Sequence, residues 1–110
     1  DFSELKMIGE LQVDDTFILK SGEGIDAVLI SPVTGIIMEI ETNQPAIVAY
    51  IPKTIPQLWE YQTGPVTEFP SICLETQNFP DAPNHHNFPS SILNPGEKYL
   101  NRSIFRFIVG

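Results

Sequence analysis

Short apolar runs separated by turn-forming residues constrain the fold of this chain most strongly. No stretch repeats its apolar residues with the period of about 3.6 that an amphipathic helix requires. Residues 36–41 (I-I-M-E-I-E) instead alternate between the two faces of a predicted strand. Glu39 and Glu41 then share one face, which we expect to be solvated. The pattern predicts an all-β protein with little helix.

Turn signals divide the chain into six predicted strands. The sequence S-P-V-T-G at 31–35 places Pro32 early in a turn and Gly35 where a positive φ is required, which predicts a tight hairpin. Residues 46–51 are almost continuously apolar, so we expect this strand to be buried on both faces. The predicted strands are residues 13–19, 25–30, 36–41, 46–51, 71–77 and 99–109. About six strands separated by turns predict an antiparallel β-sandwich.

The charge of the chain argues against several kinds of partner. Six basic residues against fourteen acidic residues give a net charge of −8. No basic patch is present to follow a phosphate backbone, so we expect no nucleic-acid partner. An anionic membrane surface is an equally poor partner, and the apolar runs are too short to span a bilayer.

Cys73 is the only cysteine, which excludes an internal disulfide. A lone cysteine is typical of a reducing compartment, so we expect a cytoplasmic protein. In a strand, such a residue is more typical of a small buried hydrophobic side chain than of a nucleophile.

Glu75 is the residue in the predicted strand 71–77 that needs an explanation. Ile72 and Leu74 point to one face of this strand and Cys73 and Glu75 to the other, so both faces carry residues that prefer burial. An ionised glutamate is costly to bury unless it is paired, and groups held at such a cost are often functional. Glu75 is therefore either a functional carboxylate or a solvated strand residue.

Three segments near the end of the chain resemble a known family. They are C-L-E-T-Q-N-F-P-D-A-P-N at 73–84, N-F-P at 87–89 and N-P-G-E-K-Y at 94–99. Together they resemble the C-terminal end of the aldose 1-epimerase (galactose mutarotase) family. The resemblance implies a large antiparallel β-sandwich whose concave sheet holds the sugar. Residues 1–110 would be the C-terminal part of that single domain, and the remaining N-terminal portion of the same protein would be their partner.

The resemblance also implies an activity, the interconversion of the α and β anomers of free hexoses such as galactose or glucose. It assigns Glu75 as the general base and places the acid, a histidine, outside this chain. Both steps are proton transfers, so no cofactor or metal is implied. We expect partial burial to raise the pKa of Glu75 and improve it as a base. The alternative is a mutarotase-like carbohydrate-binding domain that does not turn over its sugar.

Asp14 is the second residue that the resemblance assigns, as a ligand of sugar hydroxyls. The segment D-D-T-F at 14–17 matches a D-H-N-F pattern of the family at its first and last positions. Asp15 replaces the histidine and Thr16 the asparagine. Neighbouring strand residues point to opposite faces, so only one of Asp14 and Asp15 can reach the ligand. The sequence leaves open which one does.

For the remaining candidate residues, the sequence supports less specific functional interpretations. Val48 occupies a position where some family members contact the sugar through a polar side chain, so the substrate preference does not carry over. His85 and His86 lie in a proline-rich loop, where we expect them to be surface or loop-packing residues. Adjacent histidines alone also make a poor metal site. Trp59 and Tyr61 could stack on a sugar or pack onto the core.

Overall fold

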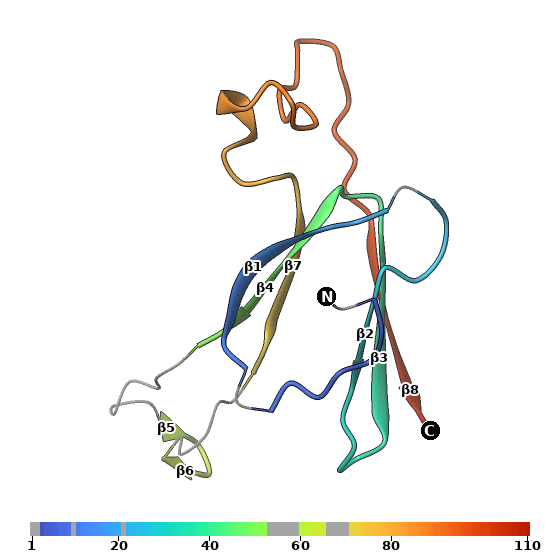
Figure 1. Ribbon diagram of the computed structural model, residues 1–110, viewed down its shortest axis with the longest axis vertical. Coiled ribbons are helices and arrows are strands. Elements are labelled where there is room, and N and C mark those ends of the chain that lie inside the picture. Colours follow the sequence, from blue (N-terminus) through green and yellow to red (C-terminus); the bar gives the residue numbers. More distant parts are fainter. Residues whose placement is uncertain (1–2, 10, 21, 53–59, 66–70) are drawn as a thin grey trace.

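A computed structural model describes residues 3–9, 11–20, 22–52, 60–65 and 71–110. Two three-stranded antiparallel sheets face each other in it (Figure 1). Sheet A has the order β1-β4-β7 and sheet B the order β2-β3-β8, and a two-stranded ribbon, β5-β6, stands apart. The elements are β1 Val13–Ile18, β2 Ala27–Ile30, β3 Ile36–Thr42, β4 Ala46–Ile51, β5 Glu60–Tyr61, β6 Gly64–Pro65, β7 Cys73–Gln77, the 3-10 turn η1 Ala82–Asn84, and β8 Ser103–Val109.

The prediction of an all-β antiparallel fold is confirmed. Each of the six predicted strands is present, and β4 has the predicted bounds. The last strand begins later than predicted, because the side chain of Asn43 holds the segment before it. Its Oδ1 accepts the N–H of Arg102 at 2.8 Å, and its Nδ2 donates to the carbonyl of Leu100 at 2.9 Å. Among the described residues, no helix is long and apolar enough to cross a membrane.

The predicted hairpin joins β2 to β3. The N–H of Ser31 donates to the carbonyl of Ile36 at 2.9 Å, and the N–H of Gly35 donates back to Ser31 at 2.9 Å. Gly35 has φ 72°, the positive value that the turn requires.

A chain of hydroxyl groups joins the inner faces of the two sheets. The Oγ1 of Thr76 on β7 lies 2.7 Å from the Oγ of Ser103 on β8, which lies 2.9 Å from the Oγ1 of Thr42 on β3. The strand registers place Ile47 and Leu74 on the same inner face of sheet A as Thr76. The side chains of these residues therefore point toward sheet B, where Ile40 is fully buried.

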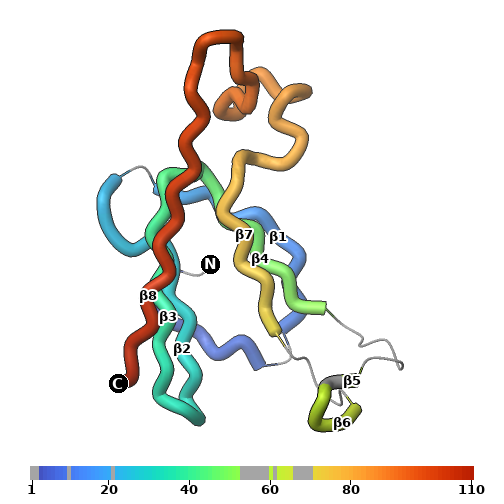
Figure 2. The backbone as a smooth tube through the Cα atoms, turned by 180° about the vertical axis from the view of Figure 1, so that it is seen from behind, coloured from blue at the N-terminus to red at the C-terminus, as the bar shows by residue number. Residues whose placement is uncertain are grey.

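The sheets meet near the turn between β3 and β4 and separate toward their other end, as Figures 1 and 2 show. Among the described residues, the buried apolar ones are Val13, Ile40, Ala46, Ile47, Ala49 and Ala82. Where the sheets separate, an open apolar cavity of about 410 Å³ lies between them. Its lining includes Leu29, Met38 and Phe107 from sheet B and Ile51 from sheet A.

Two burial predictions need correction. Glu41 is half-buried on the outer face of sheet B, where Arg106 Nη2 lies 2.7 Å and Arg102 Nη2 3.9 Å from its carboxylate. Glu41 is therefore ion-paired and only partly solvated, and Glu39 is also half-buried. β4 is not buried on both faces, because Tyr50 on its outer side is exposed.

Candidate functional site

The outer face of sheet A turns away from sheet B and carries both residues assigned from the resemblance. Residues directly opposite each other in a ladder share a face. The register forms three rows, Asp14–Tyr50–Cys73, Thr16–Val48–Glu75 and Ile18–Ala46–Gln77. These nine residues are called the outer face of sheet A below. Ala46 is its only fully covered member, and five of the nine are exposed.

Asp14 and Glu75 lie on this outer face, from the two edge strands, while Asp15 points to the opposite side of β1. Two strand spacings and an offset of two residues separate their Cα atoms by about 12 Å. The register thus selects Asp14 over Asp15 as the acid that shares a face with Glu75.

The expected partial burial of Glu75 is wrong. Its side chain is exposed, whereas Cys73 and Leu74 beside it are half-buried. The physical reason is that Glu75 lies on the outer face of sheet A, which points away from sheet B and is not covered by it. The burial on which the expectation for Glu75 rested is therefore not found.

The two carboxylates make no hydrogen bond or ion pair with any described residue. Asp26 differs from them, because its Oδ2 accepts the backbone N–H of Thr42 at 2.8 Å and so has a structural role. Asp14 and Glu75 have no such role in holding the described residues together. Their oxygens are available to solvent or to a ligand.

Val48 lies between Thr16 and Glu75 and gives the middle of the outer face an apolar character. It is half-buried and belongs to the central strand of the sheet. A ligand held between Asp14 and Glu75 would place an apolar surface against this strand and polar groups toward the two edges.

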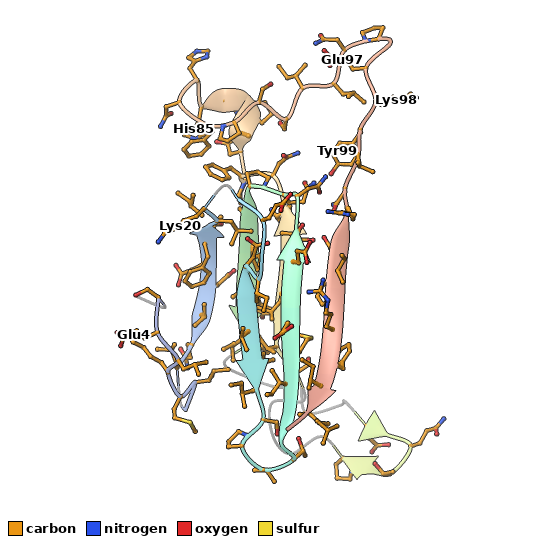
Figure 3. The ribbon with its side chains drawn as sticks, turned by 90° about the vertical axis from the view of Figure 1, so that its right-hand side faces the viewer. Glu4, Lys20, His85, Glu97, Lys98 and Tyr99 are labelled. Atoms are coloured by element: carbon orange, nitrogen blue, oxygen red, sulfur yellow. The ribbon has the colours of Figure 1, made fainter. Side chains whose placement is uncertain are left out.

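His85 and His86 are exposed, as predicted. His85 lies in the loop beyond the strand ends (Figure 3). His85 Nε2 lies 3.1 Å from Asp81 Oδ2, and Asn84 Nδ2 donates to the other oxygen of the same carboxylate. The ring of His85 stacks on Phe88 at 4.6 Å between centroids. These contacts give His85 a role in ordering the loop. The described residues contain no group of three or more His, Cys, Asp or Glu side chains that could hold a metal.

The sequence profile of the family described as aldose 1-epimerase matches residues 1–106. The chain belongs to the aldose 1-epimerase family. The fold agrees with this membership, because the described residues form antiparallel sheets and contain no α-helix.

Relatives of this chain are named galactose mutarotase or aldose 1-epimerase. Galactose mutarotase of Rattus norvegicus is 38% identical over 77 residues, and that of Homo sapiens is 36% identical over 77 residues; each match covers 69% of this chain and 22% of the relative. Aldose 1-epimerase of Escherichia coli (strain K12) is 27% identical over 100 residues, covering 86% of this chain and 29% of the relative. The chain therefore spans less than a third of the length of these family members.

Sequence reasoning missed Tyr50 as a residue of the outer face. The apolar run around it predicted burial, and only the pairing with Asp14 and Cys73 shows which way it points. Alternation along residues 46–51 puts Tyr50 and Val48 on the same face of this strand, but it does not show which face of the sheet that is. Trp59 lies outside the described residues, and only the backbone of Tyr61, in β5, is described.

Proposed function

We propose that this chain is the C-terminal part of an aldose 1-epimerase that interconverts the anomers of free hexoses such as galactose or glucose. The observation that supports this most directly is that Asp14 and Glu75 share the outer face of sheet A. Neither carboxylate makes a hydrogen bond or an ion pair within the described structure. Membership of the aldose 1-epimerase family supports the reaction class.

In the proposed mechanism, Glu75 removes the proton from the C1 hydroxyl of the sugar. The bond between C1 and the ring oxygen breaks, C1 becomes an aldehyde carbon, and an acid delivers a proton to the ring oxygen. Rotation about C1–C2 exposes the other face of the aldehyde. The ring oxygen then adds to that face, and both protons return. Asp14 holds sugar hydroxyls and keeps C1 next to Glu75.

The acid and the rest of the sugar site are proposed to come from the upstream portion of the same polypeptide. An exposed carboxylate on an edge strand is a weak base for this step until water is excluded around it. We therefore expect these 110 residues alone to be inactive. We propose a cytoplasmic location, which rests on the single cysteine.

Polarimetry of α-galactose and α-glucose tests the proposal. The rate of relaxation is measured with this chain alone and with the chain joined to its upstream sequence. The joined protein is expected to accelerate relaxation, and Glu75→Gln to lower kcat by at least about a hundredfold, because it removes the general base. Glu39→Gln is the matched control, since it makes the same change on sheet B and should leave the rate unchanged.

Two results would contradict the proposal. If the joined protein binds hexose but leaves relaxation at its buffer rate, the chain is part of a carbohydrate-binding domain instead. If relaxation is accelerated equally by the wild type and by Glu75→Gln, the assignment of the base is wrong.

A further inference from the structure

Tyr50 is the large side chain that the central strand of sheet A presents on its outer face. Of the three outward residues of β4, Ala46 is fully buried, Val48 is half-buried and Tyr50 is 40% exposed. Its hydroxyl makes no hydrogen bond with any described residue. A tyrosine exposed at the centre of a sheet, with no partner for its polar end, has no evident structural task.

The position of Tyr50 places it within reach of both proposed sugar-binding carboxylates. Asp14 lies directly opposite Tyr50 on β1, and Cys73 lies directly opposite it on β7. Glu75 is the diagonal neighbour, two residues along β7 from Cys73. Directly opposite Cβ atoms are about 5 Å apart and diagonal neighbours about 7 Å, which a tyrosine side chain can span.

The chemistry of this position suits the carbon face of a pyranose. The face of an aromatic ring is electron-rich and attracts the C–H groups of a sugar, while the ring excludes water from the hydroxyls beside it. Val48, next along the same face, continues the apolar surface toward Glu75. Binding sites for small polar ligands combine such an apolar floor with a few polar groups that fix orientation. Here those polar groups are the two carboxylates at the edges.

We propose that Tyr50 is a sugar-binding residue whose ring stacks on the carbon face of a free aldopyranose held between Asp14 and Glu75. This rests on the proposed function for the identity of the ligand. The ring, rather than the hydroxyl, supplies the main contact. Tyr50 aligns the sugar on the sheet and takes no part in proton transfer.

The test uses the chain joined to its upstream sequence, with galactose and glucose as ligands. Dissociation constants are measured by calorimetry in a Glu75→Gln background, and KM by polarimetry in the active protein. Tyr50→Leu is expected to raise Kd and KM about five- to tenfold with kcat little changed, because it removes an aromatic contact made in both ground and transition states. Tyr50→Phe is expected to keep most of the affinity. Tyr99→Leu, an exposed tyrosine outside this face, serves as the matched control.

A second measurement does not depend on the Tyr50→Leu variant folding. Tyrosine rings of the chain joined to its upstream sequence are followed by NMR after selective ¹³C labelling, and the Tyr50 and Tyr99 signals are assigned with Tyr50→Phe and Tyr99→Phe. Titration with galactose or glucose is expected to shift the Tyr50 ring signals and to leave those of Tyr99 in place.

The outcomes separate this inference from the proposed function. If Glu75→Gln abolishes turnover but Tyr50→Leu leaves Kd and KM unchanged, or Tyr50 signals do not move with sugar, the inference is overturned and the epimerase proposal stands. If turnover is absent but the protein binds hexose and Tyr50→Leu weakens binding, the inference stands and the epimerase proposal fails. Absence of hexose binding overturns both.

Discussion

At the residue scale, the pairing of strands decides which acids can act together. The sequence does not distinguish Asp14 from Asp15, because they are adjacent and identical, and both are exposed in the structure. Their partners across β4 differ, since Asp14 pairs with Tyr50 and Asp15 with Ala49. Only the first of these partners lies on the outer face that carries Glu75.

The pair gives a prediction with an internal control. In the chain joined to its upstream sequence, Asp14→Asn is expected to raise KM for galactose or glucose about tenfold or more, because it removes charge-assisted hydrogen bonds to sugar hydroxyls. Asp15→Asn makes the same chemical change on the opposite face and should change KM less than twofold. Steady-state polarimetry gives both values, and equal effects of the two substitutions would show that the register does not govern ligand contact.

At the element scale, the sequence predicts strands and the β2–β3 turn well, but not the contacts that end them. Alternation and turn residues are local properties, so strands such as β3 and β4 were predicted to within one residue. The start of β8 depends on Asn43, which is distant along the chain and shows no local signal. The exposed state of Glu75 depends on which face of sheet A is covered by sheet B, and that is a property of the whole fold.

The turn at residues 94–97 lies within one of the segments that resemble the family, and hydrogen bonds define its conformation. The N–H of Glu97 donates to the carbonyl of Asn94 at 3.1 Å, around Pro95 and a Gly96 with φ 88°. The Glu97 carboxylate accepts a hydrogen bond from the backbone N–H of Asn94 at 2.8 Å. This bond is the main cause of the lowered pKa of Glu97. The motif N-P-G-E is therefore explained by its turn, without a role in the proposed site.

The hairpin between β2 and β3 gives a stability prediction. A Cβ added to Gly35 would lie 3.3 Å from the backbone oxygen of Gly110, and the residue already has a positive φ. Gly35→Ala is therefore expected to lower the free energy of unfolding by about 1 kcal/mol or more, measured by urea denaturation. Val33→Ala, in the same turn but 93% exposed, is the control and should stay within about 0.5 kcal/mol of the wild type. Equal effects would mean that the turn does not require glycine.

At the scale of the whole molecule, the described residues form two sheets that cover each other only in part. The hydroxyl chain through Thr76, Ser103 and Thr42 ties them at one end. At the other end the inner face of sheet B is open, and Phe107, which belongs to that face, is 70% exposed. Large exposed apolar areas are uncommon on soluble monomers and promote association.

The open inner face predicts how these 110 residues behave in isolation. We expect sedimentation velocity to show association that increases with protein concentration, and a hydrophobic dye such as ANS to bind. The net charge of −8 opposes contact between copies, so added salt should strengthen association by screening that repulsion. Phe107→Ser should weaken association and dye binding together, because it removes an apolar side chain from the open face.

Ile108→Ser is the matched control for this prediction. Ile108 neighbours Phe107 on β8 but points to the outer face of sheet B, and it is 43% exposed. That face also carries Glu39, Glu41 and Arg106, whose charges interrupt its apolar surface. A chain that stays monomeric at every concentration, or loses association equally in both variants, would show that the open inner face is not what drives contact. A selective effect of Phe107→Ser would identify that face as the surface that needs covering, and joining the upstream sequence should then abolish the dye binding.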